Sequence, residues 1–313
     1  MRPVLAPAFE AQRATFLEAL RVRGQSPATR RSRGESLSAF FAWTQSAGIA
    51  DVREVTRETI RSYQLALRAA KLSAATIHAR LIALRRFFEH LEAQDAILFN
   101  PCAGLVLPPL GDRLPRAVLT KAEARKILDA PDTQTKKGLR DRAILEAFYS
   151  TGLRGAEMTA LTVHDVDTRA GFVRVRRGKG ARERVVPLGA KAARCVAEYL
   201  AQVRRPWSEE KKDERALWLS AIRPHQPLSQ AAIALMVSGY KHAAGIAQPG
   251  RTHLWRHTCA THLVAAGVSL AHVQRLLGHR SLRTTQIYTR VAPAEVQATH
   301  RKAHPRAKVR AVS

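Results

Sequence analysis

Four short segments in the second half of the chain bring together side chains that can do chemistry. They are residues 150–157 (STGLRGAE), 177–181 (RGKGA), 253–258 (HLWRHT) and 277–288, which runs from LGH to TTQIY. Guanidinium groups bind oxyanions through paired hydrogen bonds, imidazoles exchange protons near neutral pH, and a phenol can act as a nucleophile. Together these residue types suit a reaction in which negative charge develops on substrate oxygens.

The charge of the chain indicates the kind of partner. Lys and Arg number 52 against 25 Asp and Glu in 313 residues, which gives a formal net charge of +27 and a pI near 11.3. Such an excess destabilises a compact chain by self-repulsion, so it usually persists because the partner is a polyanion. Neutralising phosphates releases condensed counterions, which drives binding to nucleic acids. Charge alone does not separate DNA from RNA, or an enzyme from a packaging protein.

Other residues bear on compartment and metal content. Cys102, Cys195 and Cys259 are far apart and form no CxxC pair, so neither a disulfide framework nor a zinc ribbon is expected. No apolar run approaches the roughly 20 residues that span a bilayer. His253 and His257 lie four residues apart, which could suggest zinc, but no HExxH glutamate accompanies them. We therefore expect a cytoplasmic, nucleoid-associated protein without a bound metal.

The first hundred residues have the pattern of a helical domain. Ser26 followed by Pro27 predicts the start of a helix. A later segment carries an apolar stripe at helical spacing, made of Ile77, Leu81, Leu84, Phe88 and Leu91. Arg80, Arg85 and Arg86 lie off this stripe and are candidates for DNA contacts, although a solvated helix face explains them equally well.

A proline-rich stretch, residues 107–115 (LPPLGDRLP), separates this region from the rest of the chain. Three prolines and a glycine in nine residues cannot propagate a helix or lie inside a sheet, so we expect a linker. A new helix is predicted after Thr120, because Glu123 completes a capping box. The predicted organisation is a helical domain over residues 1–105, a linker over 106–118, a larger domain over 119–303 and a tail over 304–313.

The larger domain is expected to be mostly helical with one β element. Residues 172–175 (FVRV) and 183–186 (ERVV) are β-prone runs that flank two glycines, which predicts a hairpin with Lys179 at its tip. After Pro187 the pattern becomes helical again. Pro206 and the basic residues 211–212 indicate a loop, and Ser229 is expected to begin a further helix. The predicted fold class is therefore mainly α with a small β-sheet.

The order of the polar residues resembles the tyrosine recombinases, the family of phage integrases and Xer-type recombinases, and is most like the Xer type. The family pattern of Arg, Lys, His-x-x-Arg, His or Trp, and Tyr is matched in order. The matching residues are Arg154, Lys179, His253, Arg256, His279 and Tyr288. The resemblance covers nearly the whole chain. It implies an N-terminal core-binding domain of SAM-like helical fold and an α+β catalytic domain.

The resemblance implies a role for each of these residues. Tyr288 would attack a backbone phosphate and form a 3′-phosphotyrosine, which conserves the energy of the broken bond. Arg154 and Arg256 would clamp the non-bridging oxygens, where charge concentrates in the transition state. Lys179 would protonate the leaving 5′ hydroxyl.

Histidines and a carboxylate complete the candidate site. His253 and His279 would donate to the same oxygens and assist proton transfer. Glu157 and His257 would orient the catalytic residues from behind. No carboxylate cluster for Mg²⁺ is present in the pattern, and an isoenergetic exchange needs neither ATP nor another cofactor.

By resemblance, the partner is double-stranded DNA at a specific recombination site. The recombinase would act as a dimer on each site and a tetramer in the synapse, alone or with a second recombinase. It would exchange strands through a Holliday junction in DNA integration, excision or dimer resolution. Two alternatives remain at this point: a catalytically silent DNA-binding protein of the same fold, and a type IB topoisomerase-like enzyme that relaxes DNA without site specificity.

Overall fold

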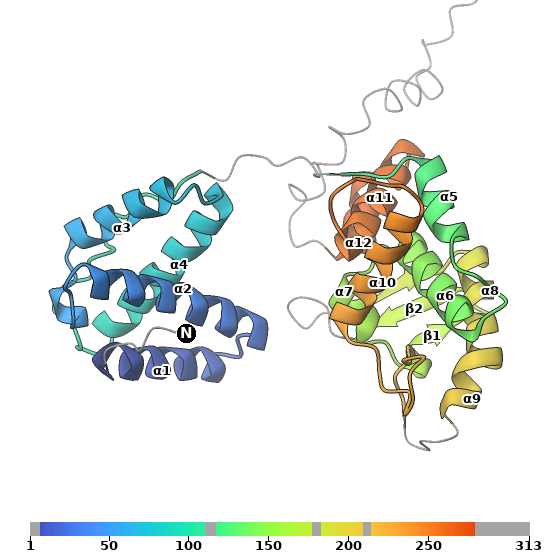
Figure 1. Ribbon diagram of the computed structural model, residues 1–313, viewed down its shortest axis with the longest axis horizontal. Helices are drawn as coiled ribbons and strands as arrows, with labels where there is room; N and C mark the ends of the chain where they lie inside the picture. The colour runs from blue at the N-terminus through green and yellow to red at the C-terminus, as the bar shows by residue number, and fades with distance from the viewer. Residues whose placement is uncertain (1–6, 110–116, 177–182, 209–213, 279–313) are drawn as a thin grey trace, which may run out of the picture. The chain divides into compact units, whose positions relative to one another are not determined.

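A computed structural model of the chain describes residues 7–109, 117–176, 183–208 and 214–278 (Figure 1). The chain divides into two compact units, Met1–Gly111 and Asp112–Ser313. This division falls inside the predicted linker, whereas the predicted domain limits at residues 105, 118 and 303 stay a prediction. Within the described residues the fold is mainly helical with one small antiparallel sheet, which confirms the predicted fold class.

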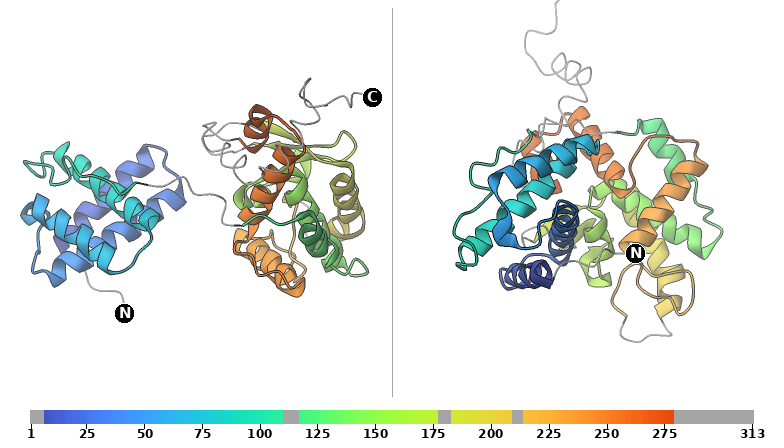
Figure 2. Two further views of the ribbon diagram at one scale, coloured as in Figure 1. Left: turned by 90° about the horizontal axis from the view of Figure 1, so that it is seen from above. Right: turned by 60° about the vertical axis from the view of Figure 1, so that its left-hand side comes forward.

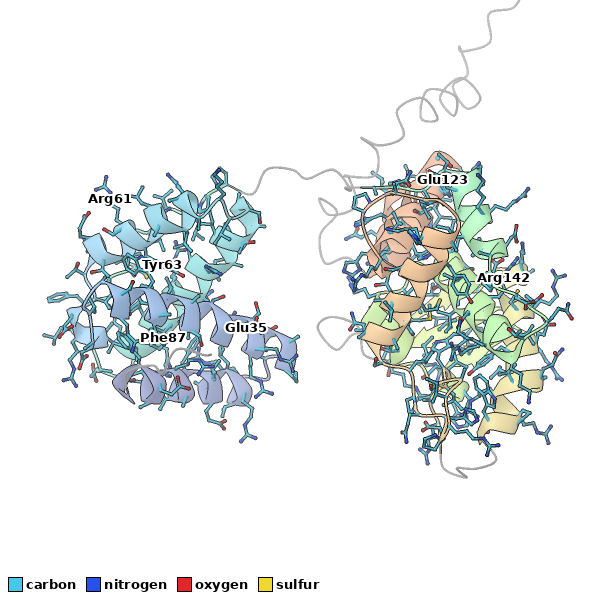
Figure 3. All side chains as sticks on the ribbon, in the orientation of Figure 1. Glu35, Arg61, Tyr63, Phe87, Glu123 and Arg142 are labelled. Carbon is cyan, nitrogen blue, oxygen red and sulfur yellow. The ribbon has the colours of Figure 1, made fainter. Side chains whose placement is uncertain are left out.

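The N-terminal unit is built from α1 (Pro7–Val22), α2 (Pro27–Ser46), a 3₁₀ turn (Val52–Glu54), α3 (Arg57–Ala69) and α4 (Ala74–Glu92) (Figures 1 and 2). The predicted start of α2 is confirmed, because the Ser26 hydroxyl accepts a hydrogen bond from the Thr29 amide at 3.2 Å. The apolar stripe predicted for α4 is buried along its whole length. It packs into an aromatic core in which Phe40, Phe87 and Phe88 are fully buried. Figure 3 labels Phe87 in this core.

In the C-terminal unit, α6 is packed between three other helices. The elements of this unit in chain order are α5 (Lys121–Asp129), α6 (Lys136–Thr151), α7 (Gly155–Thr159), a 3₁₀ turn (Val163–Asp165), β1 (Val166–Asp167), β2 (Phe172–Val175), β3 (Arg184–Pro187), α8 (Ala190–Tyr199), a π-helical turn (Leu200–Arg204), α9 (Arg205–Ser208), α10 (Gln230–Ala243), α11 (Thr252–Ala265) and α12 (Leu270–Leu277). Helix α6 packs against α5, α8 and α11. The capping box at Thr120 and the helix start at Ser229 are confirmed.

The three strands form an antiparallel sheet in the order β1-β2-β3. Strands β2 and β3 pair with Val173 opposite Val186, as a hairpin requires. Strand β3 begins at Arg184 rather than at Glu183, and the short strand β1 was not predicted. The tip of the hairpin, which holds Lys179, lies outside the described residues.

The prediction of a loop at Pro206 is wrong. Pro206 lies in α9, directly after the π-helical turn Leu200–Arg204. Proline has no amide hydrogen, but a helix tolerates it where the regular hydrogen-bond pattern is already broken. Burial of Val203 and Trp207 on the core side keeps the chain helical here. The basic residues 211–212 lie outside the described residues.

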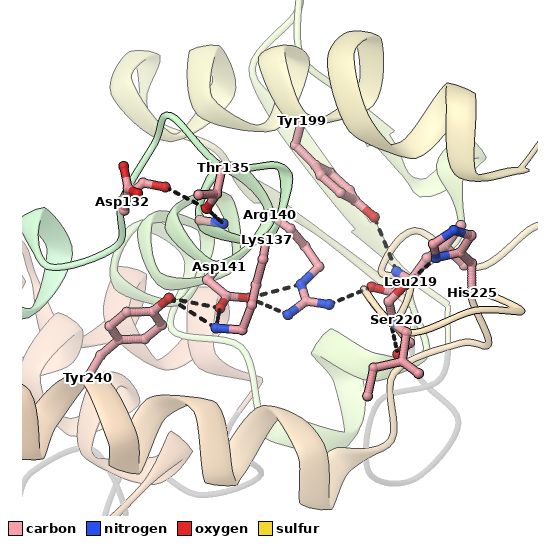
Figure 4. Close-up of polar contacts among 12 residues, drawn as sticks. Asp132, Thr135, Lys137, Arg140, Asp141, Tyr199, Leu219, Ser220, His225 and Tyr240 are labelled. Carbon is pink, nitrogen blue, oxygen red and sulfur yellow. Dashed lines mark hydrogen bonds and ion pairs between the residues drawn. The ribbon is translucent and has the colours of Figure 1, made fainter.

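A buried polar network fixes α6 against α10 and the segment after α9 (Figure 4). The Asp141 carboxylate is fully buried and accepts hydrogen bonds from Arg140 at 2.6 and 2.8 Å, from Lys137 at 3.0 Å and from the Tyr240 hydroxyl at 2.9 Å. Arg140 also donates to the Leu219 carbonyl at 2.9 Å. A buried charge with this many donors is compensated, and the network joins α6 to Tyr240 of α10 and to the Leu219 segment. No helix in the described part of the chain has the length and hydropathy to span a membrane.

Candidate active site

Arg154 lies in a sharp turn between α6 and α7. Gly152 ends α6 in the left-handed conformation, with a φ of 61°. A Cβ at this position would lie 2.9 Å from Leu277 Cδ2 and 3.3 Å from Cys259 Sγ, so the turn needs glycine for its conformation and for space. Two residues later, Arg154 caps the N-terminus of α7, and its side chain is 24% exposed.

Glu157 is the carboxylate that holds Arg154. Its Oε1 accepts a hydrogen bond from the Arg154 guanidinium at 2.8 Å, and its Oε2 accepts one from the Arg154 backbone amide at 2.9 Å. Burial alone would raise the pKa of Glu157, but hydrogen bonds and charges of Arg184 and Arg154 outweigh it and lower the pKa to about 2. Glu157 therefore contacts Arg154, one of the residues that it was expected to orient.

Helix α11 supplies the second arginine and two histidines. Arg256 is 5% exposed and donates to the Gly152 carbonyl at 2.8 Å and to the Leu277 carbonyl at 2.6 Å. Burial lowers the pKa of His253, and the charges of Arg256 and Arg154 lower it further. Burial, then His253 and Arg256, lower the pKa of His257 to about 4. Both imidazoles are therefore neutral at pH 7, and His253 lies within electrostatic reach of both arginines.

The C-terminal end of α12 is where these groups meet. The last carbonyls of a helix lack intrahelical partners and carry the negative end of its dipole. Arg184 Nε donates to the Leu276 carbonyl at 3.0 Å, and Arg154 is 3.5 Å from the Gly278 carbonyl. With the bond from Arg256 to Leu277, the three consecutive carbonyls of residues 276–278 each face an arginine. We call the carbonyls of residues 276–278 and the arginines that face them, Arg154, Arg184 and Arg256, the α12 terminus.

The described part of the candidate site brings together Arg154, Glu157, His253, Arg256 and His257. Lys179, His279 and Tyr288 lie outside the described residues, and His279 directly follows Gly278 in the sequence. The arginines of the α12 terminus face one carboxylate and neutral carbonyls, so the cluster retains positive charge. An anion such as a phosphodiester can be held there by charge-assisted hydrogen bonds.

Arg184 is a site residue that the sequence analysis missed. Its two terminal nitrogens donate to the two oxygens of Glu157 at 2.9 and 2.8 Å, and its side chain is only 12% exposed. Side chains alternate between the two faces of a strand, and Arg184 therefore shares a face with the buried Val186 while Val185 is exposed. An arginine on the inward face of a strand was the signal that could have found it.

The three arginines proposed for DNA contacts on α4 differ in their surroundings. Arg86 is 60% exposed and pairs with Glu89 at 2.8 Å. Arg85 is half-buried and donates to the Leu105 carbonyl. Arg80 is half-buried, and its charge counteracts part of the rise that burial causes in the pKa of Tyr63. Arg86 is therefore the most accessible of the three.

No set of three or more His, Cys, Asp and Glu side chains is arranged to hold a metal ion in the ranges that the structure describes. Cys259 is 3% exposed beside Gly152 and packs as a small buried apolar side chain. Burial raises the pKa of its thiol to about 12.

Comparison with known proteins places both units in one family. The model of the phage integrase family matches residues 117–295, and that of the phage integrase N-terminal SAM-like domain matches residues 14–95. The chain is 40% identical over 294 residues to "Tyrosine recombinase XerC 2" of Ralstonia nicotianae, which covers 92% of this chain and 84% of the relative.

Solved structures show the same fold at lower identity. The XerH site-specific recombinase in a post-cleavage complex with its difH substrate has a TM-score of 0.71 at 22% identity, covering 89% of this chain and 81% of XerH. A lambda integrase tetramer bound to a Holliday junction has a TM-score of 0.67 at 20% identity, covering 89% of this chain and 76% of the integrase. These two likenesses show the fold.

Proposed function

Because this chain belongs to the phage integrase family of tyrosine recombinases, we propose that it cuts and rejoins DNA at a specific site with Tyr288 as its nucleophile. One observation carries the assignment of the site. Arg154, Arg256 and Arg184 meet at the α12 terminus. His279 directly follows Gly278, the last residue of this cluster, in the sequence. The scissile phosphate would bind beside this cluster.

The arginines would hold the phosphate during the reaction. A guanidinium carries five N–H donors, so Arg154 can keep Glu157 and still donate to a non-bridging oxygen. Arg256, on α11, would supply the second pair of guanidinium N–H donors to the phosphate oxygens. Donors fixed in advance cost no reorganisation when charge builds up on the phosphate, which makes them effective stabilisers of the transition state.

The proposed bond changes conserve atoms and charge. The Tyr288 hydroxyl oxygen attacks the phosphorus, the bond from phosphorus to O5′ breaks, and a 3′-phosphotyrosine forms. His253, neutral because of its lowered pKa, accepts the proton of Tyr288. Lys179 protonates the leaving O5′, and His279 donates to a non-bridging oxygen. The reverse sequence joins a new 5′ hydroxyl to the phosphate, so no ATP is consumed.

We propose duplex DNA with a specific site as the partner, bound by a dimer and brought together by a tetramer. Related structures support this, since XerH was solved with its difH substrate and lambda integrase as a tetramer on a Holliday junction. A second recombinase could replace half of the subunits. The net charge of +27 supports binding to DNA and a cytoplasmic, nucleoid-associated location.

The test is covalent trapping on a nicked duplex. The duplex would carry an inverted-repeat site recovered from random-sequence DNA by selection with the full chain. Wild type should give a covalent band on a denaturing gel, and Tyr288→Phe should not. Tyr149→Phe, which alters a half-buried tyrosine bonded to His262, should keep the band.

Each alternative predicts a different result. Tight binding without a band from wild type would indicate a silent DNA-binding protein. Relaxation of a supercoiled plasmid that lacks the selected site would indicate a topoisomerase-like activity.

A further inference from the structure

Arg184 connects three elements of the C-terminal unit. It projects from β3, grips both oxygens of Glu157 on α7 at 2.8 and 2.9 Å, and donates to the Leu276 carbonyl of α12 at 3.0 Å. Its aliphatic stem and guanidinium also pack on Gly278, where a Cβ would lie 3.3 Å from Arg184 Cδ, Nε and Cζ. The left-handed Gly278, with a φ of 65°, leaves the room that this packing needs.

Arg184 differs from the two arginines that would hold the phosphate. All three of its guanidinium nitrogens already donate to protein acceptors, and its side chain is only half as exposed as that of Arg154, 12% against 24%. Its bidentate grip on a carboxylate is the strongest geometry available to an arginine. Three of its five N–H donors are in these bonds, and the guanidinium cannot turn toward a substrate without giving them up, so we place its contribution in the neighbours that it holds.

The charges around Glu157 show what that contribution is. One carboxylate lies between two guanidiniums, so the trio carries a net charge of +1. Oε1 is shared between Arg154 and Arg184, and Oε2 between Arg184 and the backbone amide of Arg154. Without Arg184, the full negative charge of Glu157 would fall on Arg154, and the pair would be neutral.

We propose that Arg184 is a positioning residue for the recombination reaction: it holds Glu157 and the end of α12 in place and leaves Arg154 charged for the phosphate. This rests on the proposed function, because the phosphate is the ligand that Arg154 would stabilise. The effect belongs to the chemical step. Remote contacts with DNA do not depend on Arg184, whereas the alignment of Arg154 and the charge of its guanidinium do.

The experiment compares Arg184→Gln and Arg184→Lys with wild type on the nicked duplex used above. At saturating DNA, Arg184→Gln should cleave about 10- to 100-fold more slowly, the loss expected for a small misalignment of a catalytic group. Its dissociation constant for the duplex should change less than about threefold. Arg184→Lys should recover only part of the rate, because lysine keeps the charge but lacks the planar fork.

Arg142 offers a matched control. Its side chain, labelled in Figure 3, is 15% exposed and bridges two carboxylates, Asp129 at 2.7 Å and Glu146 at 3.3 Å. It makes no hydrogen bond to the described part of the candidate site. Arg142→Gln should therefore cleave at close to the wild-type rate. An equal loss of rate in Arg142→Gln and Arg184→Gln would overturn the proposal, because the loss of any buried arginine would then slow cleavage to the same extent.

Two further readouts separate positioning from general support of the fold. If Arg184 acts through Glu157, then Arg184→Gln should slow cleavage little further in a Glu157→Gln background. Independent, multiplying losses of rate would overturn the proposal. In a ¹³C titration of the Glu157 carboxyl without DNA, Arg184→Gln should raise its pKa from about 2 toward the ordinary range.

The titration tests the role of Arg184 independently of the proposed recombinase activity. If wild type binds the duplex but forms no covalent bond, the recombinase assignment of this site fails. An unchanged Glu157 pKa in Arg184→Gln would overturn the positioning role by itself, whether or not the wild type cleaves.

Discussion

Glu157 shows how a single carboxylate links stability to the candidate site. Its pKa of about 2 in the folded chain compares with 4.5 for an ordinary glutamate. A depressed pKa means that ionised Glu157 stabilises the fold above pH 4.5, and that this stabilisation is lost as the pH falls from 4.5 toward 2. At 1.36 kcal/mol per pKa unit the contribution near pH 7 is on the order of 3 kcal/mol, and its side chain, 4% exposed, is little screened by solvent.

We therefore predict that Glu157→Gln lowers the free energy of unfolding by about 3 kcal/mol at pH 7, and by about half of that at pH 3. Urea denaturation at both pH values measures the two differences. Glu89→Gln is the control, since Glu89 is a carboxylate paired on the surface, and such pairs contribute at most about 1 kcal/mol. If wild type and Glu157→Gln differ in free energy of unfolding by the same amount at both pH values, ionisation of Glu157 does not cause the difference.

His257 predicts a separate dependence on pH. Its pKa is about 4 in the folded chain and 6.5 in an ordinary histidine. The unfolded chain therefore binds a proton below pH 6.5 that the folded chain does not yet bind, and stability falls as the pH drops from 6.5 to 4. Wild type should lose about 2 kcal/mol more than His257→Gln between pH 7 and pH 5. Equal losses in the two proteins would show that His257 is not held neutral by its surroundings.

At the scale of elements, the turn between α6 and α7 depends on Gly152. The position requires a left-handed φ, and its missing side chain makes room for Leu277 and Cys259. Gly245 is a matched comparison, because it has a φ of 70° and no atom lies within 4 Å of the place that a Cβ would take. Gly245→Ala thus isolates the cost of the backbone conformation.

We predict that Gly245→Ala lowers the free energy of unfolding by about 1 kcal/mol, and that Gly152→Ala costs about 1–3 kcal/mol more, because its Cβ would overpack Leu277. Denaturant titrations of the two variants give the difference. Gly152→Ala should also slow cleavage, since the Gly152 carbonyl accepts a bond from Arg256. Equal costs would mean that Leu277 and Cys259 move aside freely.

Local signals predicted several of these elements. Ser26, Thr120 and Ser229 mark helix starts because their side chains cap backbone amides within one turn, a contact that depends only on neighbouring residues. The hairpin was predicted from two β-prone runs around a pair of glycines, a signal that likewise depends only on residues close together in the sequence. Strand β1, with two residues, is too short to leave a pattern, and it exists because it pairs with β2.

Contacts between distant residues could not be predicted in this way. Arg184 and Glu157 are 27 residues apart, and the bond from Arg256 to the Gly152 carbonyl spans 104 residues. Pro206 misled because the packing of Val203 and Trp207 overrides its local preference. The family pattern named Arg154 and Arg256, whereas the α12 terminus that joins them to Arg184 depends on tertiary structure.

At the scale of the whole molecule, the charge of the chain governs how it meets DNA. With a net charge of +27, phosphate contacts should dominate affinity. Each neutralised phosphate adds about 0.9 to the slope of log K against log salt concentration, so that slope counts the contacts. Arg86 and Arg21 allow one contact to be assigned, because they are 60% and 66% exposed and each pairs with a glutamate three residues away.

We predict that Arg86→Gln weakens binding of the full chain to duplex DNA and reduces the salt slope by about one, while Arg21→Gln leaves the slope unchanged. The two variants lose the same charge, so any difference reflects where that charge lies and not the net charge of the chain. Fluorescence anisotropy between about 50 and 200 mM salt, with selected and random duplexes, measures both slopes. Because a phosphate contact carries no sequence information, Arg86→Gln should weaken binding to both duplexes by the same factor. A slope for Arg86→Gln equal to that of the wild type would remove Arg86 from the DNA interface, and a loss confined to the selected duplex would instead make Arg86 a base-reading residue.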